Sequence, residues 1–155
     1  DASKRIGKVV RTTKDPWGKA TLGLRTFLEV VQEPAYRRVV IQEGPVVLGY
    51  ERYREQEERS TFAIVQEIVA SVLAAYDLEP SMVETFSRVF FGAMSSAGAA
   101  VSSAEDTSRA SAEVEAAISF ILAGLRQQAE SGVELPGPAD LVPGASPADE
   151  GDARA

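Results

Sequence analysis

The stretch from Ser81 to Ala104, SMVETFSRVFFGAMSSAGAAVSSA, decides the fold of this chain. Its apolar residues recur at intervals of three and four, which is the spacing of one face of an α-helix. They are Val83, Phe86, Val89, Phe90, Ala93, Met94, Ala97 and Val101. From Val89 to Ala104 there is no charge, and small residues four apart, such as Gly92 and Ser96, let two helices approach closely. The stretch therefore predicts a long helix that packs on another helix, in this chain or in a second copy.

The residues before this helix predict how it begins. Asp77 to Pro80 has the composition of a turn. Ser81 and Glu84 then have the spacing of a capping box, in which the serine caps the helix and the glutamate reaches back to it.

A second helix of the same kind is predicted downstream, after a polar loop around residues 105–108. Its repeating residues are Ala110, Val114, Ala117, Ile118, Ile121, Leu122 and Leu125. We expect it to stop at Ser131-Gly132, because glycine is common just past a helix end. Residues 133–155 hold four of the eight prolines and no aromatic residue, so we expect them to be disordered.

Working upstream, Asp15-Pro16 predicts the start of another helix. Aspartate can cap free N–H groups, and proline fits the first helical position. A buried face follows at helical spacing: Trp17, Ala20, Leu24, Phe27, Leu28 and Val31. Glu33-Pro34 is expected to end this helix and to begin the next, from Ala35 to about Glu43.

Between these regions, Gly44-Pro45 predicts a bend, because proline cannot donate a backbone hydrogen bond. A helix from about Tyr50 to Tyr76 is expected to follow. Its first half is heavily charged and its second half, from Phe62 to Ala75, is almost wholly apolar. Such a helix is expected to run from solvent into a core.

These elements predict an all-α protein, an antiparallel bundle of about five to six helices. Residues 1–14 are read as the end of a helix that begins outside the sequence, since the first residue is Asp1 rather than Met. Residues 15–131 are expected to form the folded domain. Residues 132–155 are the acidic, Pro/Gly-rich tail.

Composition excludes several classes of protein. With no cysteine and no histidine, the chain has no disulfide, no zinc site of the usual kind, and no Ser-His-Asp or Cys-His catalysis. The net charge of −7 argues against nucleic acid or an anionic membrane as a partner of the whole chain. The first 25 residues are nevertheless basic, and they either contact DNA phosphates or, more simply, form a solvated linker helix.

Three further patterns partly resemble sites of chemistry. Gly44 and Gly49 have the glycine spacing of a phosphate loop, but its Lys and Ser/Thr are missing. Glu51, Glu55 and Glu58 share one helix face, yet di-iron sites of that kind also need histidine, so a solvated face is favoured. Ser95 and Ser96 lie near glycines without the motif or base of a hydrolase. We therefore expect no enzyme, no metal and no cofactor.

The segment Glu33–Glu55, EPAYRRVVIQEGPVVLGYERYRE, closely resembles the C-terminal regions of tetracycline-repressor (TetR) family regulators. Four shorter segments share the resemblance, which covers about residues 15–128. They are Asp15-Pro16-Trp17, Leu24–Leu28, Phe91–Met94, and Glu113–Ala117 with Leu122–Leu125.

The resemblance implies a homodimeric, all-helical transcriptional regulator of bacterial, cytoplasmic type, most often a repressor. In this family an N-terminal domain reads DNA, and the C-terminal domain binds a small, often hydrophobic effector. The last two long helices of each subunit form a four-helix bundle with those of the partner. The DNA-reading domain is absent from this sequence, so DNA is expected as a partner only through that domain, and no membrane is expected.

Mapping this scheme onto the chain predicts two sets of site residues. The effector is expected to lie among Trp17, Leu24, Phe27, Leu48, Phe62, Gln66, Phe90 and Met94, with the Gln66 amide either orienting it or bonding within the core. The dimer interface is expected to contain Phe86, Val89, Ala93, Ala97, Ala100, Val114, Ala117, Ile118, Ile121 and Leu125. The alternative is a structural dimerisation module whose pocket is filled by its own side chains.

Overall fold

The computed structural model describes residues 2–38, 48–75 and 81–133, together with Gly137, Leu141 and Pro143. In these residues all regular structure is helical. The elements are α1 (Ala2–Val10), α2 (Pro16–Gln32), α3 (Pro34–Arg37), α4 (Leu48–Ala75), α5 (Met82–Ser103) and α6 (Thr107–Glu130). The prediction of an all-α bundle of about five to six helices is confirmed.

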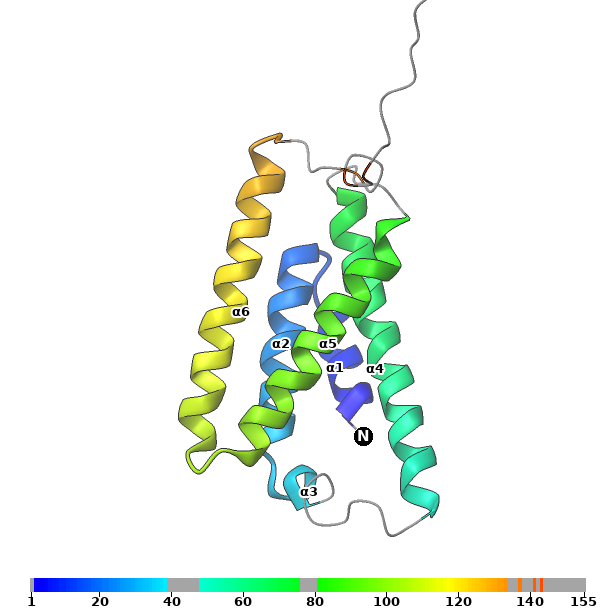
Figure 1. The fold of residues 1–155 in the computed structure, drawn as a ribbon, viewed down its shortest axis with the longest axis vertical. Helices are drawn as coiled ribbons and strands as arrows, with labels where there is room; N and C mark the ends of the chain where they lie inside the picture. The colour runs from blue at the N-terminus through cyan, green and yellow to red at the C-terminus, as the bar shows by residue number, and fades with distance from the viewer. Residues whose placement is uncertain are drawn as a thin grey trace, which may run out of the picture.

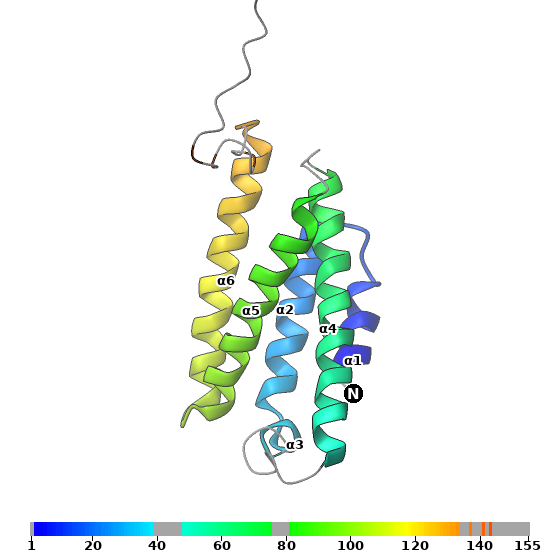
Figure 2. The same cartoon turned by 45° about the vertical axis from the view of Figure 1, so that its right-hand side comes forward.

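Helix α2 lies at the centre of the bundle, where it contacts each of the other five helices. Figures 1 and 2 show α5 crossing it obliquely, with α6 at one edge of the bundle and α1 on the opposite side of α2. Helix α4 packs against α1, α2 and α5, whereas α6 packs mainly on α2 and α5. The central helix therefore connects the α1–α4 side of the bundle to the α5–α6 side.

The burial pattern explains why α2 takes the central place. Leu24, Leu28 and Val31 are buried at helical spacing and pack with Val101 of α5 as one cluster. On the other side, Ile6 and Val10 of α1 are buried against the same bundle. In α6, by contrast, Ser111 is the one buried residue. Ala110, Val114 and Ile118 of this helix pack half-buried against the core cluster, whereas Phe120 and Ile121 are exposed.

Glycine allows α2 and α5 to approach closely at their crossing. A Cβ placed at Gly98 would lie 2.6 Å from Phe27 Cζ and 3.4 Å from Val31 Cγ1. The Phe27 ring thus occupies the space that any other side chain at position 98 would need. Beside it, the buried Ser102 hydroxyl donates hydrogen bonds to the Gly98 carbonyl at 2.8 Å and to the Val31 carbonyl at 3.3 Å.

The predicted ends of α2 are confirmed. Asp15 is its N-cap, and Asp15 Oδ2 accepts a hydrogen bond from the Gly18 N–H at 2.7 Å. Pro16 begins the helix and Glu33 ends it, with Pro34 opening α3. At the end of α6, Gly132 has a φ of 69°, the left-handed conformation that glycine adopts readily, so the predicted stop at Ser131-Gly132 is also confirmed.

Two local predictions are wrong. Ser81 makes no side-chain capping bond, because its backbone is already helical (φ −62°, ψ −21°) and its hydroxyl is not aimed at the free N–H groups. Glu84 instead accepts a hydrogen bond from Arg88 one turn later. Helix α6 begins at Thr107, inside the predicted loop, because the Asp106 carboxylate caps it by accepting from the Arg109 N–H at 2.9 Å.

Several other predictions fall outside the described residues. They are the second part of the helix expected at 35–43, the Gly44-Pro45 bend, the turn at 77–80 and, apart from the single residues named above, the tail beyond Val133. Helix α4 was expected to enter the core with its apolar second half. Only Val69 and Leu73 of that half are buried, since the helix packs along one side of the bundle rather than through it.

We predict that Gly98→Ala destabilises the fold by about 1–3 kcal/mol, the usual cost of overpacking a filled core. The added methyl group would collide with the Phe27 ring. Urea unfolding followed by circular dichroism measures this cost. In a Phe27→Leu background the same substitution should cost clearly less, because the smaller side chain leaves room. A Gly98→Ala protein as stable as the parent would contradict this account of the crossing.

Candidate functional site

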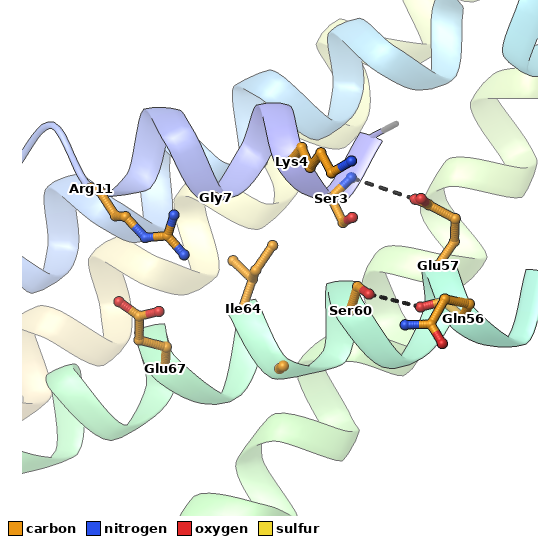
Figure 3. A pocket seen from close by; sticks show the side chains of 10 residues that line it. Ser3, Lys4, Gly7, Arg11, Gln56, Glu57, Ser60, Ile64 and Glu67 are labelled. Carbon is orange, nitrogen blue, oxygen red and sulfur yellow. Dashed lines mark hydrogen bonds between the residues drawn. The ribbon is translucent and has the colours of Figure 1, made fainter.

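A groove of about 560 Å³ runs between α1 and α4. Figure 3 shows its side chains converging from the two helices. Helix α1 contributes Ser3, Lys4, Gly7 and Arg11, and α4 contributes Gln56, Glu57, Ser60, Ala63, Ile64 and Glu67. This volume lies within the range of about 300–1,000 Å³ that is typical of small-molecule sites.

The groove has an apolar centre between polar ends. Its centre consists of Gly7, Ala63 and Ile64, and a Cβ placed at Gly7 would lie 3.6 Å from Ile64 Cδ1. The two carboxylates at its ends already have donors within the chain. Glu57 Oε2 accepts a long hydrogen bond, 3.5 Å, from the Ser3 N–H, and Glu67 Oε1 lies 3.8 Å from Lys19 Nζ.

Helix α1, which forms one wall of the groove, is held by packing and by one ion pair. A Cβ at Gly23 of α2 would lie 3.4 Å from both Val10 Cγ2 and Ile68 Cδ1, so α1, α2 and α4 meet around that glycine. The Arg5 guanidinium is paired with the Glu33 carboxylate at the junction of α2 and α3. The hydrogen bond to Glu33, with the negative charge of that group, raises the pKa of Arg5 above its ordinary value.

The residues predicted to line an effector cavity do not all come together. Leu24, Phe27 and Met94 meet at the α2–α5 cluster, where Leu24 is buried and the other two pack against it. Trp17 is also buried, at the start of α2. These side chains fill space within the bundle, so the cavity that they were predicted to line stays a prediction.

The rest of that predicted set lies elsewhere. The Phe62 ring meets the Phe91 ring edge-on, with centroids 5.6 Å apart, at the contact of α4 and α5. Arg88 lies 5.9 Å from the centroid of the Phe62 ring. Phe90 is half-buried and Gln66 is exposed on α4. The side chain of Leu48 lies outside the described residues.

The residues predicted to form a dimer interface divide into two groups. Val114 and Ile118 pack against the core cluster, and Phe86, Ala97 and Leu125 are half-buried. The exposed group contains Val89, Ala93 and Ala100 on α5 with Ala117 and Ile121 on α6. Because these recur every three to four positions, they lie along one side of each helix. We call this exposed group, with Phe120, the α5–α6 face.

Sequence reasoning missed Phe120, which is the most exposed large apolar residue described, at 81%. Val89 and Ile121 on the same face are 63% and 52% exposed. Two glycines accompany them, since a Cβ at Gly92 or Gly124 would meet nothing within 4 Å. The available signal was the uncharged run from Ala116 to Leu125, in which Phe120 follows Ala117 by three positions.

The remaining candidates for chemistry find no geometric support. Glu55 and Glu58 are exposed, and the side chain of Glu51 lies outside the described residues, as does most of the Gly44–Gly49 segment. No cluster of three or more acidic side chains within the described ranges is placed to hold a metal ion. In the same ranges, no helix combines the length and apolarity needed to cross a bilayer.

The sequence of this chain matches a known protein family over most of its length. The family described as "Tetracyclin repressor-like, C-terminal domain" matches residues 17–125, which is most of the chain. The chain belongs to this family. The match runs from the first turn of α2 nearly to the end of α6, and so includes the α5–α6 face. A comparison with curated proteins finds no match.

Family membership agrees with the resemblance seen in the sequence. Tetracyclin repressor-like C-terminal domains belong to regulatory proteins rather than to enzymes. Such domains generally dimerise and bind small-molecule effectors. The described helices of this chain form a domain of this family with two surface features, the α1–α4 groove and the exposed α5–α6 face.

Proposed function

We propose that this chain is the effector-binding and dimerisation domain of a transcriptional regulator, most simply a repressor. A small ligand bound to it modulates DNA binding by a separate DNA-reading domain. The observation that carries the proposal is the exposed, uncharged α5–α6 face in a chain of the tetracyclin repressor-like family. The face is the part of the molecule best suited to contact a second copy.

Electrostatics and packing support a homodimer through this face. No charged residue occurs from Val89 to Ala104 or from Ala116 to Leu125. Charged side chains are depleted at the cores of protein interfaces, whereas aromatic residues such as Phe120 are enriched there. An exposed apolar patch of this kind on an otherwise acidic molecule would favour aggregation unless it were covered. A second copy, related by a two-fold axis, covers it with the same residues.

The two open glycines fit the same proposal. A glycine inside an exposed helix costs about 0.5–1 kcal/mol relative to alanine. Among the described residues, no atom lies within 4 Å of a Cβ placed at Gly92 or Gly124. A close helix–helix contact with a second subunit gives both positions a role. They would then be the points where the two subunits approach most closely.

The central helix α2 connects the helices of the groove with the helices of the proposed dimer interface. Helix α1, whose N-terminal end leads towards a DNA-reading domain in the proposed full-length protein, packs on α2 and α4. Helices α5 and α6 pack on α2 from the other side. A ligand that changes how α1 sits on α2 therefore changes the position of that domain relative to the dimer.

One observation favours the alternative, a structural dimerisation module without a ligand. The Phe27 ring fills the space over Gly98, and the side chains around it form a packed cluster. If every cavity in the bundle is filled in this way, the domain holds two DNA-reading domains together and binds no effector.

We predict that Phe120→Glu converts a dimer into a monomer, weakening association by at least about 100-fold, or ~2.7 kcal/mol. The substitution places a charge at the centre of the apolar face. Light scattering at micromolar concentration measures the change. Ser119→Glu is the matched control, because Ser119 lies on the side of α6 that carries the Arg126–Glu130 ion pair. A parent protein that is monomeric at this concentration would overturn the proposed dimer.

We predict opposite effects of Gly124→Leu in the dimer and in the monomer. In the Phe120→Glu background it should stabilise the fold by about 0.5–1 kcal/mol, because leucine has the higher helix propensity. In the parent protein it should weaken the dimer about tenfold or more, because the side chain separates the subunits. Thermal unfolding and light scattering measure the two effects. Unchanged dimerisation would place Gly124 outside the interface.

A ligand screen separates the two candidate functions. We predict that an effector at 100 times its dissociation constant stabilises the domain by about 2.7 kcal/mol, which appears as a rise in melting temperature. A structural module should show no such rise with any member of a broad library of small organic acids, bases and neutral compounds. The Phe62→Ala and Gln66→Ala proteins test where a hit binds, since binding unchanged in both would place it outside the predicted cavity.

A further inference from the structure

The α1–α4 groove has one charged group that the fold itself does not use. The Arg11 guanidinium makes no hydrogen bond or ion pair with any described residue. Its Nη2 atom nevertheless lies 3.9 Å from the position of a Cβ on Gly7, so the side chain folds back along α1 to the centre of the groove. A Cβ at Gly7 would lie within ordinary contact distance of both the guanidinium and Ile64, so Gly7 lies between these two side chains.

The charges around Arg11 favour an anion over a cation in the groove. Glu67, the nearest carboxylate in Figure 3, is engaged by Lys19 at 3.8 Å, and Glu57 accepts from the Ser3 N–H. Lys8 adds a further exposed positive charge on the same helix. A bound anion therefore meets a guanidinium whose charge no described carboxylate neutralises.

The neighbours of Arg11 restrict the kind of anion. Two carboxylates at the ends of the groove repel a dianion such as phosphate more strongly than they repel a single negative charge. A guanidinium binds a carboxylate through two parallel hydrogen bonds. The apolar centre of Gly7, Ala63 and Ile64 offers no polar partner, so it suits a carbon skeleton.

The far end of the groove supplies a polar anchor. Ser60 Oγ donates to the Gln56 carbonyl at 2.8 Å, so the hydroxyl oxygen can still accept a hydrogen bond. Ser60 and Glu67 are seven residues apart on α4, which corresponds to about 10 Å along the helix. That span fits a molecule with one aromatic ring between two polar ends.

We propose that the α1–α4 groove binds a small organic monocarboxylate, with the carboxylate on Arg11, an apolar body over Gly7, Ala63 and Ile64, and a hydroxyl on Ser60. The inference rests on the proposed function in one respect, that the occupant is the regulatory ligand. Because such a ligand bridges α1 and α4, it acts directly on the helix that leads to the DNA-reading domain. It is a more polar effector than the resemblance alone implied.

The test uses 4-hydroxybenzoate as the probe, 4-hydroxybenzamide as its neutral counterpart and inorganic phosphate as a dianion. Nuclear magnetic resonance titration of the ¹⁵N-labelled full chain follows the amides of Gly7, Arg11 and Ala63. We expect 4-hydroxybenzoate to shift these amides. The amide and phosphate should bind at least about tenfold more weakly, a difference of ~1.4 kcal/mol.

Two substitutions locate the site. Arg11→Gln should weaken binding of 4-hydroxybenzoate about tenfold or more, and Ser60→Ala a few-fold, because a neutral hydrogen bond is worth less than a charge-assisted one. Lys14→Gln is the matched control, since it removes the same charge from an exposed residue outside the groove and should leave binding unchanged. The dispersion of the amide spectrum verifies that each variant is folded.

Three outcomes would overturn the inference: no shift of the groove amides at up to about 10 mM probe, equal binding by parent and Arg11→Gln proteins, or equal binding of phosphate. None of these bears on the dimer, which the Phe120→Glu experiment tests separately. A hit that binds among Leu24, Phe27 and Met94 instead would support the proposed function while excluding the groove as its effector site.

Discussion

The crossing of α2 and α5 at Gly98 is the constraint on which the rest of the bundle depends. The Phe27 ring lies where a side chain at position 98 would be, and Val31 and Val101 are wholly buried beside it. With α5 held this close, the Ser102 hydroxyl reaches the Val31 carbonyl and the Arg37 guanidinium donates to the Ser102 carbonyl at 2.9 Å. One close contact thus positions α2, α3 and α5 together, and α6 follows through the short turn after Ser103.

This arrangement accounts for the two unequal sides of the molecule. Towards α1 and α4, helix α2 presents Gly23, around which Val10 and Ile68 pack, and Ile6 and Val10 of α1 are buried there. The ion pairs Arg5–Glu33 and Lys19–Glu67 add to this apolar packing. Exposed ion pairs contribute little to stability, typically below about 1 kcal/mol each. Buried apolar packing therefore holds α1 on α2, and the ion pairs contribute little to it. On the other side, the contacts of α5 with α2 are apolar and close.

Local chemistry and periodicity were enough to predict much of the fold from sequence. Asp15-Pro16 predicted the start of α2, because capping and proline geometry depend only on adjacent residues. The same reasoning was wrong at Ser81, whose backbone has helical dihedral angles and whose hydroxyl makes no capping bond to the free N–H groups of the first turn. Motif spacing indicates that a capping side chain is present, whereas the backbone conformation of that residue decides whether the capping bond forms.

The candidate sites were less predictable, because they depend on how helices meet rather than on any one helix. Gln66 was predicted to lie in a cavity because it is the one amide in an apolar stretch. In this stretch α4 buries only Val69 and Leu73, and Gln66 is exposed to solvent. Because residues 62–75 are almost wholly apolar, their composition did not predict which face of α4 would be buried. The position of Arg11 was not predicted either, because the other wall of its groove comes from α4, whose lining residues follow Arg11 by 45 to 56 positions. The surroundings of a glycine show how closely another helix approaches at that position. The Phe27 ring fills the space at Gly98, whereas no described atom lies within 4 Å of a Cβ at Gly124, which the second subunit would cover in the proposed dimer.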